Sequence, residues 1–295
     1  MFQVSGFTFH NMRYVFFGTP EFAAIALRHL LDAGLPPAAV VCNPDRPTGR
    51  KKIVTPPPVK SLVMKHETRN IAILQPERLD EGFILQVSRF KPELFIVAAY
   101  AKIIPQSILS IPPRGTIGVH PSLLPRLRGA SPIQSAILTG ELETGVSLYA
   151  IDAEMDHGPV FAAERLADYD TERDTTAMLL PRLAELGGRM LVELFPLLEH
   201  GTAKTIPQEH TQATFTKKFA TDDAFVAADE LAQAESGSAP ELGTSIHRKI
   251  RAFFPEPGAW TVLNGKRRKL LEGEIRDGKL LITKYQDEGK NSVAR

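Results

Sequence analysis

Short apolar segments alternate with amphipathic segments over the first two thirds of the chain. Residues 94–98 read LFIVA, an unbroken apolar run that is typical of a central strand in a parallel sheet covered on both faces. The same pattern predicts strands at 13–17, 38–42, 71–74, 116–120 and 146–151, and helices at 21–33, 59–65, 79–89 and 175–198. This alternation predicts an open α/β sheet, in which ligands bind at the carboxyl ends of the strands.

The alternation fades after residue 200. Residues 232–244 (AQAESGSAPELGT) are small and polar, so we expect a linker or a surface insertion there. Short strand-like runs follow at 260–263, 269–271 and 280–284, with glycines between them. This second pattern predicts a small β domain at the end of the chain.

Composition excludes several classes of protein. Of the 295 residues, 43% are hydrophobic and 23% are charged, which is typical of a globular protein. Cys42 is the only cysteine, so the chain has no intrachain disulfide and no cysteine-based zinc site. The longest apolar run, residues 94–101, has eight residues, whereas a membrane span needs about 20. Residues 1–11 lack a signal-peptide pattern, so we expect a cytoplasmic protein.

Two common phosphate-binding motifs and the nucleophile motif of α/β-hydrolases are absent from the sequence. The first predicted strand leads into FFGTPEF, which lacks G-x-G-x-x-G, and neither a Walker A motif nor G-x-S-x-G occurs. The remaining cluster spans residues 115–158 and places His120 at a strand end and Asp156 in a later turn. A histidine beside a carboxylate can transfer protons, although each is also common in a purely structural role.

The wording of this cluster narrows the interpretation. VHPSLLPRLRGASPIQSAI and TGVSLYAIDAEMDHG resemble the core signature of the 10-formyltetrahydrofolate-dependent formyltransferases. VFFGTPEFAAIALRHLL, NPDRPTGRKKIVTPPPVK and IRAFFPEPGAW resemble the branch of that family that acts on methionyl-tRNA. The resemblance runs from about residue 12 to about residue 290 and so covers nearly the whole chain.

The resemblance implies a Rossmann-like, mostly parallel sheet domain followed by a small β-barrel of OB-like type. We expect an N-terminal extension at 1–11, a catalytic domain at 12–212, a linker with the start of the second domain at 213–245, and a short OB-like domain at 246–295. The implied reaction moves a formyl group from 10-formyltetrahydrofolate, a co-substrate, to the α-amine of methionyl initiator tRNA, without a metal. We expect a monomer that does not bind membranes.

The resemblance also implies the site residues. His120 and Asp156 match two of the three catalytic residues, but Gly118 stands where the family has an asparagine. An asparagine there would donate to the formyl oxygen in the transition state, so we expect Gly118→Asn to raise turnover modestly. The folate pocket is implied at Ser122, Leu123, Leu124 and Pro125, and at Tyr100, Lys102 and Ile104. Two alternatives stay open, namely another amine acceptor such as an amino-sugar nucleotide, and an impaired homologue that binds folate or tRNA.

A long loop at residues 43–58 is the expected contact with tRNA. It holds five prolines, and its composition is too polar for helix or strand. Its basic residues, by resemblance the tRNA-binding ones, are Arg46, Arg50, Lys51 and Lys52. The C-terminal residues 241–295 carry 12 basic and 7 acidic side chains, and the run KRRK at 266–269 is a second candidate contact with phosphate or an ordinary polar turn.

Overall fold

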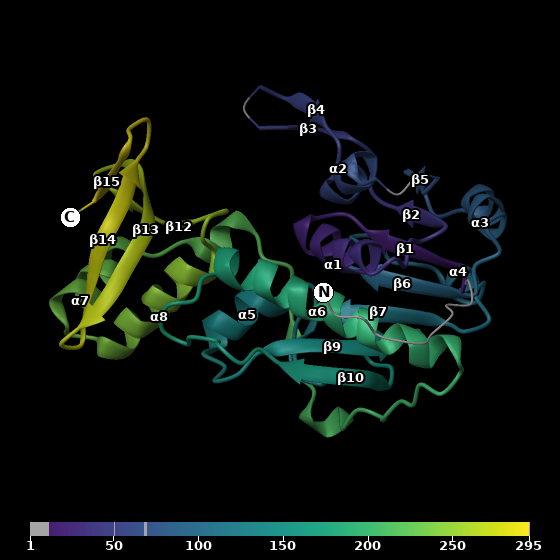
Figure 1. The fold of residues 1–295 in the computed structure, drawn as a ribbon. Coiled ribbons are helices and arrows are strands. Elements are labelled where there is room, and N and C mark those ends of the chain that lie inside the picture. Colours follow the sequence, from purple (N-terminus) through teal and green to yellow (C-terminus); the bar gives the residue numbers. More distant parts are fainter. Residues whose placement is uncertain (1–11, 50, 68–69, 295) are drawn as a thin grey trace. The chain divides into compact units, whose positions relative to one another are not determined.

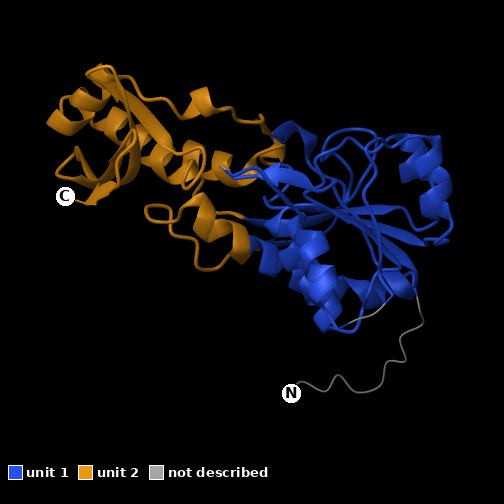
Figure 2. Cartoon of the chain, turned by 90° about the horizontal axis from the view of Figure 1, so that it is seen from above, with its two compact units in different colours: residues 1–125, 145–164, 183–213 blue, residues 126–144, 165–182, 214–295 orange. Residues whose placement is uncertain are grey.

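The chain forms two compact units, which Figure 2 shows in different colours. The computed structural model describes residues 12–49, 51–67 and 70–294, so the predicted extension at 1–11 lies outside the described residues. Unit 1 comprises the residues up to 125 together with 145–164 and 183–213, and unit 2 comprises 126–144, 165–182 and 214–295. Because each unit is assembled from separate segments, one cut in the sequence does not divide them.

Unit 1 is built on a mostly parallel sheet, as the sequence predicted (Figure 1). The seven strands lie in the order β10-β9-β7-β6-β1-β2-β5. Their bounds are β1 Tyr14–Gly18, β2 Ala39–Val41, β5 Ala72–Leu74, β6 Leu94–Ala98, β7 Thr116–His120, β9 Gly145–Ala150 and β10 Val160–Arg165. The pairs β1–β2, β1–β6, β2–β5 and β6–β7 are parallel, whereas β7–β9 is antiparallel.

Helices cover both faces of this sheet, because alternate strand residues point to opposite faces. Val15 and Phe17 of β1 share a core with Phe83 of α3, and Tyr14 packs edge-on against Phe195 of α6 with ring centroids 5.3 Å apart. The helices of unit 1 are α1 Glu21–Asp32, α2 Pro58–Lys65, α3 Glu81–Ser88, α4 Gln106–Leu109 and most of α6 Thr176–Glu199. The part of α6 that belongs to unit 1 begins at residue 183. No helix within the described ranges is long and apolar enough to cross a bilayer.

The predicted loop at 43–58 contains a β-hairpin, which corrects the expectation of irregular structure. β3 (Arg46–Thr48) pairs antiparallel with β4 (Ile53–Thr55) and projects beyond the sheet in Figure 1. Lys60 anchors its base by donating to both Asp45 carboxylate oxygens, at 2.9 and 2.8 Å, and Gln75 donates to the Asn43 carbonyl at 2.8 Å. Tertiary anchoring therefore forms the hairpin despite its proline content.

Unit 2 combines short helices with an antiparallel sheet. Its sheet has the order β12-β13-β14-β15, with bounds Ala259–Leu263, Lys266–Arg276, Lys279–Asp287 and Ser292–Ala294. The second and third predicted strand runs are therefore parts of longer strands. Residues 232–244, expected as a linker or insertion, are mainly helical and belong to α7 (Ala228–Ser236) and α8 (Pro240–Ala252). These helices pack Leu231, Ile246 and Ile250 against the sheet. The other elements of unit 2 are α5 Pro132–Thr139, β8 Arg128–Gly129, β11 Phe215–Thr216 and the 3-10 helix η2 Thr221–Ala224. A second 3-10 helix, η1 His210–Gln212, belongs to unit 1.

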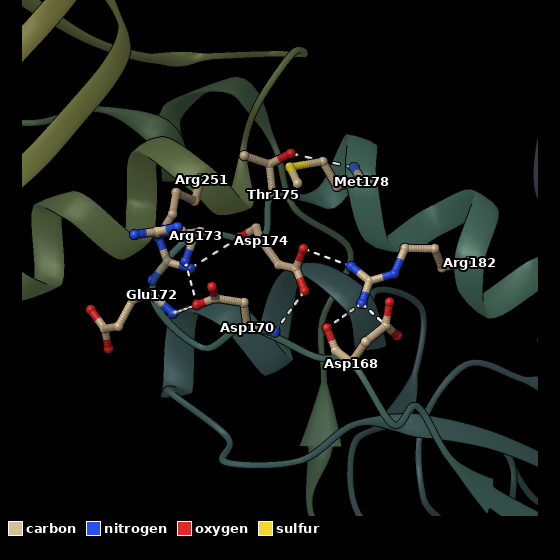
Figure 3. Close-up of polar contacts among 9 residues, drawn as sticks. All are labelled: Asp168, Asp170, Glu172, Arg173, Asp174, Thr175, Met178, Arg182 and Arg251. Atoms are coloured by element: carbon tan, nitrogen blue, oxygen red, sulfur yellow. Dashed lines mark hydrogen bonds and ion pairs between the residues drawn. The ribbon is translucent and has the colours of Figure 1, made fainter.

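A charged cluster in unit 2 orders the segment that leads into α6 (Figure 3). Arg182 donates to the Asp174 carboxylate at 2.7 Å and lies 2.8 Å from the Asp168 carboxylate. The Asp174 side chain is only 2% exposed, and it also accepts the Asp170 N–H at 2.9 Å. Arg251 of α8 donates to the Asp174 carbonyl at 3.0 Å. The cluster therefore connects the 168–174 segment to α6 and to α8.

Candidate active site

His120 is the last residue of β7, a strand whose five residues are all buried. β7 lies between β6 and β9, and His120 stands opposite Ser147 of β9. The histidine itself is 6% exposed. Its position is therefore the carboxyl end of a central strand, which is where α/β sheets bind ligands.

Asp156 lies in the turn after β9 and has a φ of 52°, in the left-handed region that aspartate tolerates better than most residues. Gln208 fixes this turn by donating to the carbonyl oxygens of Asp156 and Gly158, at 2.9 and 2.7 Å. Asp156 Oδ2 lies 3.6 Å from His120 Nδ1, and both side chains are largely buried. This separation is longer than a hydrogen bond between the two atoms. The structure thus brings together the two residues that the sequence paired.

Tyr149, a residue that the sequence analysis did not single out, joins this pair. Its hydroxyl donates to Asp156 Oδ1 at 2.6 Å, and its backbone stands opposite Gly118 in the β7–β9 pair. Burial, and next the charge of Asp156, raise the pKa of the Tyr149 hydroxyl well above its ordinary value. The phenol therefore keeps its proton at neutral pH. The sequence alone places residues 147 and 149 on the same face of β9, because side chains alternate along a strand. That His120 lies on this face of the sheet follows only from the register of β9 against β7.

The segment 122–125 turns sharply after His120. The Ser122 N–H donates to the His120 carbonyl at 2.9 Å. Ser147 holds the turn against β9, because its hydroxyl donates to the Ser122 carbonyl at 2.8 Å and accepts the Leu124 N–H at 3.0 Å. The Leu124–Pro125 bond is cis. Ser122 is buried, whereas the other three predicted folate-contact residues here, Leu123, Leu124 and Pro125, are partly exposed.

The segment 100–104 follows β6, whose carboxyl end lies beside that of β7. Tyr100 packs edge-on against Phe17 at 5.6 Å, and burial raises the pKa of its hydroxyl to about 12. Lys102 donates from Nζ to the backbone carbonyls of Pro76 and Glu77, at 2.5 and 2.9 Å. Ile104 packs at the margin of the unit 1 core. The strand order therefore puts this segment at the same edge as His120, with Lys102 already engaged in holding it.

The described basic residues of the β3–β4 hairpin, Arg46, Lys51 and Lys52, are solvent-exposed. Arg46 donates to Glu77 at 2.7 Å, with both side chains about two-thirds exposed. Lys51 and Lys52 lie in the exposed turn, and Arg50, the fourth predicted tRNA contact, lies outside the described residues. Ile53 and Val54 are 62% and 64% exposed on the second strand. The hairpin therefore presents both charge and apolar surface to solvent.

The basic run at 266–269 lies at the start of β13 in unit 2. Arg267 stacks over Trp260 at 4.1 Å, and Arg268 donates to Asp287 at 2.7 Å. Lys269 lies 3.4 Å from Glu256. Two of these four cations therefore have acidic partners, and a third covers an aromatic ring.

The group His120–Asp156–Tyr149 has the chemistry of proton transfer. An imidazole can donate to a developing oxyanion, and a carboxylate can accept the proton released by an attacking amine. In the described part of the chain, no group of three or more histidine, cysteine, aspartate or glutamate side chains is arranged to hold a metal ion. The arrangement suits acyl-type transfer between two bound substrates.

Sequence comparisons agree with this chemistry. Residues 12–195 match the formyl transferase family, and residues 241–281 match the formyl transferase C-terminal domain. The methionyl-tRNA formyltransferase of Chloroflexus aurantiacus is 38% identical over 265 residues, which are 90% of this chain and 80% of that protein. The methionyl-tRNA formyltransferase of Myxococcus xanthus is 39% identical over 267 residues, again 90% and 80% of the two chains.

Solved structures share the fold at lower identity. HypX from Aquifex aeolicus, in complex with tetrahydrofolic acid, is 19% identical with a TM-score of 0.62, covering 96% of this chain and 46% of that one. Methionyl-tRNA formyltransferase from Clostridium thermocellum is 17% identical with a TM-score of 0.57, covering 96% and 100%. From the sequence matches, the chain belongs to the formyl transferase family and groups within it with the methionyl-tRNA formyltransferases.

Proposed function

We propose that this protein transfers the formyl group of 10-formyltetrahydrofolate to the α-amine of methionyl initiator tRNA, and so supports the start of translation in the cytoplasm. The observation that carries the proposal is the His120–Asp156 pair at the carboxyl end of β7, in a chain whose relatives are named for this reaction. We further propose that the protein acts as a monomer.

The amine of the methionyl ester attacks the formyl carbon directly. The carbonyl oxygen becomes an oxyanion, to which the His120 imidazole donates a hydrogen bond. Asp156 takes the proton that the attacking nitrogen releases and passes it, through a water, to the departing N10 of the folate. Holding both substrates in one site lowers the activation barrier by roughly several kcal/mol, as in a well-oriented intramolecular reaction.

The folate is assigned to the two segments that lie at this edge of the sheet. Residues 122–125 are pinned by Ser147, and residues 100–104 are pinned through Lys102, so their backbone groups are pre-organised. Pre-organised backbone donors and acceptors bind a ligand without an entropy cost of ordering. Ser122, Leu124 and Tyr100 are among the residues that would line the folate pocket.

The hairpin is assigned to the tRNA. Lys51 and Lys52 are exposed at its turn, and Arg46 lies on its first strand. Lysine and arginine gain affinity for nucleic acid by displacing counterions from phosphate. Binding of tRNA should therefore weaken steeply with salt, whereas binding of folate should not.

A direct assay tests the proposal. The protein is supplied with 10-formyltetrahydrofolate and either methionyl initiator tRNA or an amino-sugar nucleotide, and the formylated product is measured. We expect product with the tRNA and none with the sugar; the reverse result would establish the other acceptor class, and no product with either would indicate a protein that only binds. His120→Ala is the control for the site, with an expected loss of about 10²–10³ in kcat. A variant that folds and keeps more than about a tenth of kcat would remove His120 from catalysis.

A further inference from the structure

Gly118 and Tyr149 stand directly opposite each other in the antiparallel β7–β9 pair. A Cβ atom built on Gly118 would lie 2.3 Å from Tyr149 Cε1, 2.6 Å from Cζ and 2.9 Å from the hydroxyl oxygen. Each of these distances is shorter than a real contact of a Cβ atom. Gly118 lies within a regular strand, so the glycine is needed for space rather than for an unusual backbone angle. The tyrosine ring thus occupies the volume of any side chain at position 118.

The ring carries its hydroxyl to the Asp156 carboxylate. Tyr149 OH donates to Oδ1 at 2.6 Å, while His120 Nδ1 lies 3.6 Å from Oδ2. The Tyr149 and His120 rings are nearly perpendicular, at 87°, with centroids 6.4 Å apart. Two side chains from neighbouring strands therefore approach the two oxygens of one carboxylate.

The surroundings keep the phenol in its donor form. Tyr149 is 6% exposed, and the charged or titratable groups acting on it are Asp156, its hydrogen-bond acceptor, the more distant Asp152 and the neighbouring His120. Burial and two carboxylates all oppose loss of the phenolic proton. The hydroxyl therefore keeps its proton and can donate to Asp156 at neutral pH.

We propose that Tyr149 is a positioning residue of the active site, which orients Asp156 for proton transfer, and that position 118 is a glycine because it seats the Tyr149 ring. The inference rests on the proposed roles of His120 and Asp156. It opposes the expectation that Gly118→Asn raises turnover: on this inference the variant should lose turnover, since the amide would have to displace a buried, hydrogen-bonded ring. A polar side chain of β9, Tyr149, therefore stands opposite position 118 and donates to Asp156.

Tyr149→Phe tests the hydroxyl alone, because it keeps the ring that fills the space beside Gly118. Tyr149→Phe removes the hydrogen bond that the hydroxyl donates to the Asp156 carboxylate. The loss of a hydrogen bond to a charged group should lower kcat about 10- to 100-fold, with little change in KM for either substrate. A purely structural tyrosine would not lower kcat while KM stays constant.

Gly118→Ala tests the shared volume. It should destabilise the protein, measured as a lower Tm, when Tyr149 is present, and have little effect in the Tyr149→Ala background, where the ring is gone. Equal losses of Tm in both backgrounds would overturn the seating role of Gly118. Wild-type kcat in Tyr149→Phe would overturn the positioning role.

The control with His120→Ala separates this inference from the proposed function. If His120→Ala is fully active, the proposed site itself is wrong, and the inference about Tyr149 falls with it. If His120→Ala is inactive while Tyr149→Phe behaves as wild type, the proposed function stands and only the role of Tyr149 is lost.

Discussion

Removal of the guanidinium of Arg182 should destabilise unit 2 far more than its place near the surface suggests. Arg182→Met keeps most of the apolar stem of the side chain. The Asp174 carboxylate, whose side chain is 2% exposed, would then keep one of the partners drawn in Figure 3, the backbone N–H of Asp170. Stranding a buried charge costs about 3–5 kcal/mol. Arg182 is itself 25% exposed and Asp170 still donates, so we expect the lower end, about 3 kcal/mol.

Urea unfolding followed by tryptophan fluorescence measures this loss. Trp260 is the only tryptophan, and it lies in unit 2 between Arg267 and Phe225, at 4.1 and 4.7 Å, so its emission reports on that unit. With a slope of about 2 kcal/mol per molar urea, the midpoint should fall by about 1.5 M.

Asp168→Asn is the matched control for this prediction. It removes another carboxylate from the same arginine, but the Asp168 side chain is 76% exposed, and solvent screens that interaction. The Asp168→Asn midpoint should therefore stay near that of the wild type. Equal midpoints for Arg182→Met and Asp168→Asn would refute the reasoning from burial.

Three other perturbations have clear expected outcomes. Burial raises the pKa of the Cys42 thiol from 9.0 to about 11. The stability that the protonated thiol contributes is therefore fully present below pH 9 and is lost as the pH rises towards 11. Over that range, the Tm of Cys42→Ala should fall less than the Tm of the wild type. Lys51→Ala combined with Lys52→Ala should raise KM for tRNA and flatten its salt dependence, while KM for folate stays unchanged in steady-state kinetics. Asp80 caps α3 by accepting the Phe83 N–H at 3.1 Å, so Asp80→Ala should cost about 1 kcal/mol in urea unfolding.

The sheet and the position of His120 were predictable because their signals are local. Buried parallel strands such as β6 require unbroken apolar runs, and these are visible in one dimension. His120 ends such a strand, so the rule that ligands bind at the carboxyl ends of parallel strands predicted its place. Asp156 follows β9, which runs antiparallel to β7, so its pairing with His120 was predicted from the family resemblance. The structure confirms that the two side chains lie close together, with 3.6 Å between His120 Nδ1 and Asp156 Oδ2.

The features that the sequence did not reveal depend on tertiary contacts. The β3–β4 hairpin is polar and rich in proline, and its base is held by Lys60 and Gln75 from outside the loop. α7 and α8 were interpreted as linker because their small polar residues mask the few apolar ones that reach the core, such as Leu231 and Ile246. Tyr149 was missed because cross-strand register decides its neighbours, and register is not a property of one strand's sequence.

Strand β9 holds two parts of the site from one face. Ser147 secures the turn after His120, and two residues later Tyr149 secures Asp156. An inserted or deleted residue within β9 would rotate both side chains to the opposite face in a single step, because side chains alternate along a strand. In a library of single-residue insertions, β9 should therefore behave as an intolerant segment, whereas the exposed turn of the β3–β4 hairpin should accept changes in length. Over evolutionary time, we therefore expect the length of this hairpin to vary more freely than the spacing of Ser147 and Tyr149 in β9.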